Sequence, residues 1–145
     1  MHSNEKKINR LFLYWLTISL ILVFFIIIVG GLTRLTNSGL SITQWELFEG
    51  ILPPLSQISW ENYFEQYKKI PQYKILNFNM SLEEFKIIFY WEYFHRILGR
   101  ILGLLFIIPL LYFYFKKVFS REYNIKLSLL FFLILIQGAV GWYMV

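Results

Sequence analysis

Three long apolar runs constrain this chain more than any other feature of its sequence. Hydropathy places them at residues 11–31, 87–115 and 127–145, and each is near the twenty or so residues that about 30 Å of hydrocarbon requires. Because the bilayer core has no water to satisfy backbone polar groups, each run is predicted to be a helix. The composition agrees, since 57% of the residues are hydrophobic and the mean hydropathy is +0.53. We therefore expect an all-α integral membrane protein.

Lysine and arginine cluster on one side of the predicted spans. The N-terminal tail, residues 1–10, holds three basic residues against one acidic residue, and the loop at 116–126 holds four against one. The long loop at 32–86 holds five against six. The positive-inside rule then predicts that the tail and the short loop face the cytoplasm, while the long loop faces the outside. The net charge of +5 is therefore a topology signal, and we expect no nucleic-acid partner.

The long predicted loop contains a short amphipathic pattern. Four aromatic residues recur in it at helical spacing, namely Trp60, Tyr63, Phe64 and Tyr67. Ser59 is suited to be the N-cap of such a helix, and Pro71 would end it. We therefore predict a helix at about residues 59–70. Two roles stay open for this helix: it lies along the membrane interface, or it covers a cofactor held beneath it.

The second apolar run contains ionisable side chains where a membrane-spanning helix normally has almost none. They are Glu92, His95, Arg96 and Arg100. Charges at this depth are costly, so they pair with one another or mark a functional site. Glu92 and Arg96 are spaced i, i+4 with the acid nearer the N-terminus, which predicts an ion pair between them.

One face of this predicted helix collects its unusual residues. At about 100° per residue, four of them fall within about 80° of one another, and these are Glu92, His95, Gly99 and Gly103. Arg96 and Arg100 continue the same side. A capping box between Ser81 and Glu84 predicts where the helix begins, which places His95 in the outer half of the bilayer.

Each of these residues has a purely structural alternative. His95 is either an interhelical hydrogen-bond partner or an iron ligand, and Gly99-x-x-x-Gly103 either packs a neighbouring helix or makes room for a flat macrocycle. Arg96 either neutralises Glu92 or contacts a ligand. Their coincidence on one face favours a haem site, because haem needs a neutral imidazole on iron, room for its plane and cations for its propionates.

Several stretches, taken in order, resemble the haem A synthase family, and most closely its alphaproteobacterial and mitochondrial branch. They are Gly30–Ser41, Ile42–Trp45, Pro53-Pro54, Asn79–Phe85, Trp91–Arg96 and Gln137–Val145. The resemblance covers nearly the whole chain from about Leu11 onward. It implies that the three predicted helices form part of one four-helix-bundle half of an eight-helix protein.

The resemblance also implies a reaction and a set of site residues. The family oxidises a methyl group of haem O to the formyl group of haem A for cytochrome oxidase, through hydroxylation steps. By this resemblance Glu92 is the catalytic acid and His95 is the axial ligand of the haem iron. Further cofactor contacts are expected from Arg34, Arg96, Arg100 and Gly99. A haem b, which relays electrons in the family, belongs to the C-terminal half.

The sequence stops at Val145, at the end of the third predicted span. We therefore expect an N-terminal fragment of the family that is inactive alone, unless a second polypeptide supplies the other helices. The alternatives are a non-catalytic haem-binding or assembly module and an inactive remnant of a truncated gene. The partners expected are membrane lipids, haem O and either the missing C-terminal half, haem O synthase or a second copy. The expected location is the cell inner membrane, or the mitochondrial inner membrane in a eukaryote.

Overall fold

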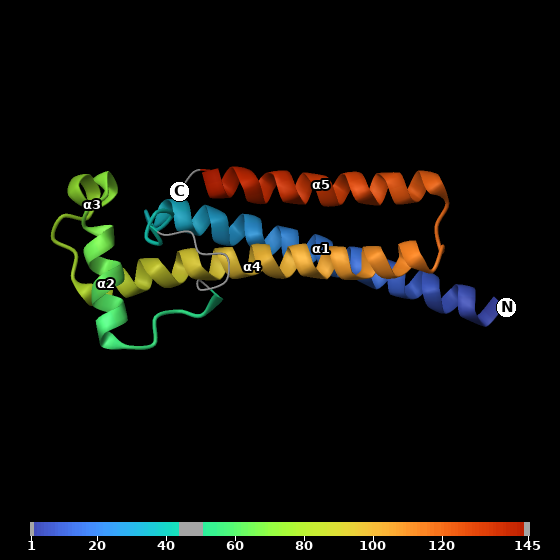
Figure 1. The fold of residues 1–145 in the computed structure, drawn as a ribbon, viewed down its shortest axis with the longest axis horizontal. Helices are drawn as coiled ribbons and strands as arrows, with labels where there is room; N and C mark the ends of the chain where they lie inside the picture. Colours follow the sequence, from blue (N-terminus) through green and yellow to red (C-terminus); the bar gives the residue numbers. More distant parts are fainter. Residues whose placement is uncertain (1, 44–50, 144–145) are drawn as a thin grey trace. The chain divides into compact units, whose positions relative to one another are not determined.

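The computed structural model describes residues 2–43 and 51–143, with side chains from residue 8 onward. The described residues form five helices and no strand, and these are α1 (His2–Leu35), α2 (Gln57–Tyr67), α3 (Pro71–Leu76), α4 (Leu82–Phe115) and α5 (Arg121–Tyr143) (Figure 1). Three of them, α1, α4 and α5, are long and apolar enough to cross a membrane. The prediction of an all-α membrane protein is thereby confirmed. Residues 144–145 of the third predicted span lie outside the described residues.

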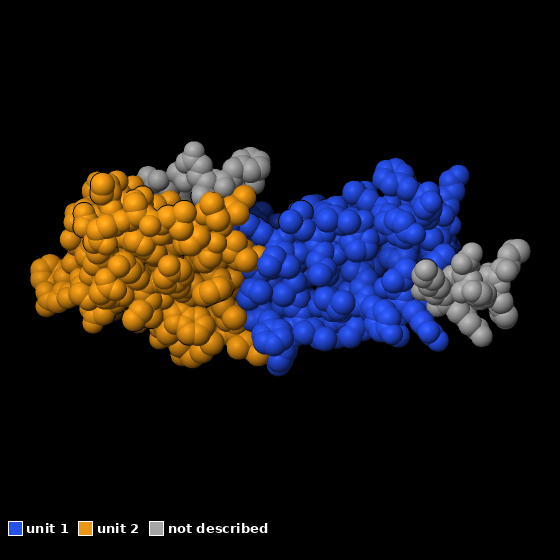
Figure 2. Space-filling view, turned by 90° about the horizontal axis from the view of Figure 1, so that it is seen from below, with its two compact units in different colours: residues 1–26, 98–141 blue, residues 27–97, 142–145 orange. Residues whose placement is uncertain are grey.

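The chain divides into two compact units, which Figure 2 colours separately. The first unit comprises residues 1–26 and 98–141, and the second comprises residues 27–97 and 142–145. The first therefore contains parts of α1 and α4 together with most of α5. The second contains the end of α1, the loop helices α2 and α3, and the N-terminal part of α4, where Glu92, His95 and Arg96 lie.

The core of the first unit is built around Trp15 of α1. Its ring centroid lies 5.0 Å from that of Phe106 and 5.6 Å from that of Phe113, both on α4. Leu127 of α5 is buried in the same cluster. Tilted ring contacts thus join α1 to α4, and buried Leu127 and the stacked rings of Phe106 and Phe131 join α5 to them.

The core of the second unit lies where α2 packs across the N-terminal end of α4 (Figure 1). The buried face of α2 consists of Trp60, Phe64 and Tyr67, which are three of the four aromatic residues in the predicted stripe. Trp60 contacts Phe89 at 4.9 Å between ring centroids, and Tyr67 contacts Phe85 at 5.2 Å. The aromatic face of this helix therefore packs against α4.

The bounds of α2 differ from the predicted helix at 59–70. Its N-cap is Ser56, and not Ser59, because the Ser56 hydroxyl accepts a hydrogen bond from the backbone N–H of Ser59 at 3.2 Å. The helix ends at Tyr67, and Pro71 begins α3 instead of ending α2. Ile70, just before the proline, is extended with φ −79° and ψ 154°, as expected because a proline disfavours the helical conformation in the residue before it.

The start of α4 has the predicted capping box. The backbone N–H of Ser81 donates to Oε2 of Glu84 at 2.8 Å, and the backbone N–H of Glu84 donates to the Ser81 hydroxyl at 3.3 Å. These two bonds satisfy amide groups that have no partner within the helix. They fix where α4 begins and therefore the register of every side chain further along it.

Candidate functional site

The site begins where α1 ends and the chain turns back toward α4. Asn37 has a positive φ of 51°, and two backbone bonds close the turn: the Ser38 N–H donates to the Thr33 carbonyl at 2.9 Å, and the Asn37 N–H donates to the Arg34 carbonyl at 3.2 Å. This pairing is a Schellman motif, in which a left-handed residue ends a helix. The Ser38 side chain is fully buried and also donates to the Thr33 carbonyl. The turn explains the hydroxyl-rich composition of this stretch.

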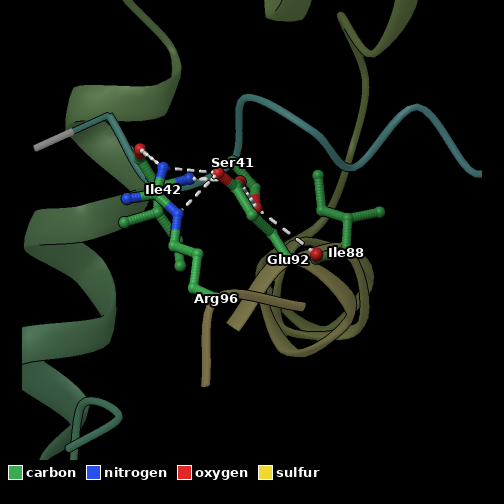
Figure 3. A network of polar contacts seen from close by, with 5 residues as sticks. All are labelled: Ser41, Ile42, Ile88, Glu92 and Arg96. Atoms are coloured by element: carbon green, nitrogen blue, oxygen red, sulfur yellow. Dashed lines mark hydrogen bonds and ion pairs between the residues drawn. The ribbon is translucent and has the colours of Figure 1, made fainter. Parts of the chain in front are cut away.

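The turn delivers Ser41 and Ile42 to the carboxylate of Glu92, as Figure 3 shows. Oε2 of Glu92 accepts hydrogen bonds from the Ser41 hydroxyl at 2.6 Å and from the backbone N–H of Ile42 at 2.8 Å. Glu92 itself is only 4% exposed. A segment fifty residues away in sequence therefore closes over this acid.

Arg96 completes the network on the other carboxylate oxygen. Its Nη2 lies 2.6 Å from Oε1 of Glu92, and its Nε donates to the same oxygen at 3.1 Å. The predicted ion pair is thereby confirmed. Nη2 also donates to the carbonyl of Ile42 at 3.0 Å, so the guanidinium links α4 to the returning chain. Four hydrogen bonds, from one hydroxyl, one backbone N–H and one guanidinium, surround this buried carboxylate, which offsets the cost of removing its charge from water.

His95 is half-buried and faces the backbone of α1. A Cβ atom added at Gly30 would lie 3.0 Å from Nε2 of His95 and 3.4 Å from its Cδ2, so a larger residue here would force the imidazole to shift away from the helix. Within residues 8–43 and 51–143, no hydrogen bond to the ring nitrogens of His95 is found. The imidazole is thus held by packing against α1, with Nε2 the ring atom nearest Gly30.

The predicted site residues are divided between the two units, and their roles remain predictions. Gly99 and Arg100 belong to the first unit, whereas Glu92, His95 and Arg96 belong to the second. Nothing lies within 4 Å of a Cβ added at Gly99, so the glycine that touches the imidazole is Gly30, on another helix. Arg34 lies exposed in the last turn of α1.

The sequence analysis did not identify three groups that contact Glu92 or His95. They are Gly30, the hydroxyl of Ser41 and the backbone N–H of Ile42. A signal for the last two was present, because a buried carboxylate needs more donors than one guanidinium supplies. No comparable signal pointed to Gly30, since it is one of two adjacent glycines and only the packing distinguishes them. Gln44 and Trp45, which the resemblance also includes, lie outside the described residues.

The donor set limits the kind of metal chemistry that this site can support. Within the described part of the chain, no group of three or more His, Cys, Asp or Glu side chains is placed to hold a metal ion. A site that binds a bare ion needs several protein ligands. A single imidazole suits a metal that brings its own macrocycle, as haem iron does.

The sequence is similar to one protein family and to several curated proteins. A family model described as cytochrome oxidase assembly protein matches residues 13–145. The heme A synthase of Nitrosospira multiformis is 56% identical over 131 residues, which cover 90% of this chain and 37% of that protein. The heme A synthase of Pelagibacter ubique is 52% identical over 147 residues, which cover 100% of this chain and 43% of that protein. No solved structure matches. The chain therefore spans about two fifths of the length of these curated relatives.

Proposed function

Because the chain belongs to the cytochrome oxidase assembly protein family, we propose that it provides the haem O site of a haem A synthase. The observation that carries this proposal is the imidazole of His95, which packs against Gly30 with no hydrogen-bond partner among the described residues. The names of the similar proteins support the same activity.

The residues on the second unit fit a haem. His95 would ligate the iron, and Gly30 lets its imidazole pack closely against α1, where a larger residue would crowd Nε2. Arg96 lies one position further along α4, where its positive charge would favour an anionic propionate nearby. Arg34, Arg100 and Gly99 remain predicted contacts of the haem.

Haem O is the substrate in this proposal, and its methyl group would be oxidised to a formyl group through hydroxylation steps. The catalytic role predicted for Glu92 remains a prediction. Its contacts favour a positioning role, because both carboxylate oxygens already accept two hydrogen bonds each. In that role Glu92 would hold the Ser41–Ile42 segment on α4, one helical turn before the imidazole.

A second candidate function is that of a non-catalytic membrane module that assists assembly. The observation in its favour is the same network, since the Glu92 carboxylate is satisfied by the protein alone. Under this alternative the network only joins α1 to α4, and His95 would have no ligand. The two candidates therefore differ in one measurable property, the binding of haem.

The proposed location is the inner membrane, with the N-terminus and the α4–α5 connection in the cytoplasm. The distribution of basic residues supports this orientation, because the described loop between α1 and α4 has no comparable excess. The proposed activity also requires the helices and the haem b ligands that the resemblance assigns to the other half of the family, in this polypeptide or in another. Haem O synthase and a second copy of this chain remain proposed partners.

Haem binding by the purified chain tests the proposal. Titration with haem O is expected to produce a Soret band whose position indicates imidazole ligation, and His95→Ala is expected to shift or abolish it. His2→Ala is the matched control, because His2 is the only other histidine. A spectrum that is unchanged in His95→Ala would reject the proposed site and favour the assembly module.

The division of roles has its own test in a complete enzyme that contains this site. If Glu92 acts on protons, Glu92→Ala should keep haem binding and lose turnover. If Glu92 positions the site, Glu92→Gln should keep most of the turnover, because the amide retains a carbonyl acceptor for the Ser41 hydroxyl. Loss of binding in Glu92→Ala as complete as in His95→Ala would contradict the catalytic role.

A further inference from the structure

A groove opens in the first unit where α4 ends and α5 begins. Its volume is about 980 Å³. Residues from both helices and their connection line it, and those that matter here are Tyr114, Lys117, Arg121, Ile125, Leu129 and Phe132. None of the residues that line the groove is among the residues predicted for the haem site.

Two cations line the groove without an acidic partner in the described part of the chain. Lys117 has a positive φ of 51°, and a Schellman motif fixes its backbone, because the Val118 N–H donates to the Phe113 carbonyl at 3.1 Å. Arg121 is the first residue of α5. In contrast, Lys126 is paired with Glu122 at 2.6 Å and does not line the groove. Lys117 and Arg121 therefore give the groove a positive charge that no described acidic side chain pairs with.

The remainder of the α5 wall is apolar and runs along the helix. Ile125, Leu129 and Phe132 are spaced i, i+4, i+7, so they form one stripe, and all three are exposed. At 1.5 Å per residue, this stripe extends about 10 Å along α5. It begins one turn after Arg121 and continues into the apolar part of the spanning helix.

We propose that this groove binds an anionic phospholipid. The phosphate would lie between Lys117 and Arg121, and one acyl chain would follow the stripe on α5. Charge decides between occupants: a neutral helix would leave both cations without a partner, whereas a soluble anion would leave the apolar stripe uncovered. Basic residues next to a spanning helix attract anionic lipid headgroups in this way.

Retention of lipid by the full-length chain tests the proposal. The protein is reconstituted with phosphatidylglycerol and phosphatidylcholine, extracted in mild detergent, and its bound lipids are measured by native mass spectrometry. We expect selective retention of phosphatidylglycerol, and a loss of about tenfold in Lys117→Gln/Arg121→Gln. Lys116→Gln/Lys126→Gln is the matched control, because it removes the same charge near the same helix ends without altering the groove.

A variant without a charge change tests the shape of the site. Ser128 lines the groove, so Ser128→Trp should displace the lipid, whereas Leu130→Trp places the same bulk on α5 outside the groove. Equal loss in the two charge variants would mean general attraction to the bilayer and would overturn the proposal. Full retention in Ser128→Trp, or a second copy of the chain bound in place of lipid, would also overturn it.

Discussion

The indole nitrogen of Trp15 on α1 donates a hydrogen bond to the carbonyl oxygen of Leu105 on α4, at 2.9 Å. This carbonyl lies four residues before Pro109, which is inside α4. In a regular helix it would accept a hydrogen bond from the backbone N–H of residue 109, but proline has none. The indole therefore supplies the donor that the proline removes, which matters in a membrane because water is not there to do so.

Replacing Trp15 tests this relationship. We expect Trp15→Phe to lower the free energy of unfolding in detergent by about 2 kcal/mol, because the carbonyl of Leu105 loses its partner. In a Pro109→Ala background the helix provides its own N–H, so the same replacement should cost about 1 kcal/mol less. The two free-energy differences come from a double-mutant cycle. Equal costs in both backgrounds would show that Trp15 acts only through packing.

The contact between Ser41 and Glu92 gives the second prediction. We expect Ser41→Ala to lower the free energy of unfolding by about 2 kcal/mol, because a hydrogen bond to a charged group is lost in a buried place. Thr17→Ala removes a hydroxyl from an exposed position on α1 and should change stability little. Thermal unfolding of both variants in the same detergent measures the difference, and a Ser41→Ala protein as stable as the control would contradict the network.

The effects of replacing Glu92 and Arg96 on the free energy of unfolding should not be additive. Arg96→Met leaves a buried carboxylate without its cation, so we expect a loss of about 3 kcal/mol in the free energy of unfolding. Glu92→Gln/Arg96→Met removes both charges and should recover part of that loss. Denaturant unfolding of the single and double variants measures the coupling. Strictly additive effects would mean that the two groups do not stabilise each other.

The stability of the protein should depend on pH in the alkaline range because Tyr67 in α2 is buried. Burial raises the pKa of its hydroxyl above the ordinary value of 10.0, although the hydrogen bond from Asn77 lowers it. The folded pKa is above the unfolded one, so the contribution to stability is complete below about pH 10 and is lost as the pH rises through the folded pKa. We expect the stability of the wild type relative to Tyr67→Phe to be constant below pH 10 and to fall above it. A constant difference at all pH values would contradict the assignment.

What could be predicted from the sequence was local. The helices α1, α4 and α5 follow from runs of apolar residues, and the Ser81–Glu84 capping box involves residues three apart. Glu92 and Arg96, which form the ion pair, lie one helical turn apart on α4, so helical periodicity alone predicts their contact.

What could not be predicted depends on contacts between distant segments. Ser41 contacts Glu92 only because the turn at Asn37 reverses the direction of the chain. Gly30 contacts His95 only because α1 and α4 pack against each other at these two residues. The same reason explains the error at Ser59, since the choice between two serines as N-cap depends on where α2 packs against α4. Spacing along one helix carries no information about such contacts.

The bond between His95 and haem iron is the central claim, and one spectroscopic measurement tests it directly. The chain is produced with isotopically labelled histidine nitrogen and loaded with ferric haem, and the hyperfine coupling of that nitrogen to the iron is recorded. We predict a coupling from one imidazole nitrogen that persists in His2→Ala and disappears in His95→Ala. A coupling that survives in His95→Ala, or none in the unaltered chain with haem bound, would contradict the account.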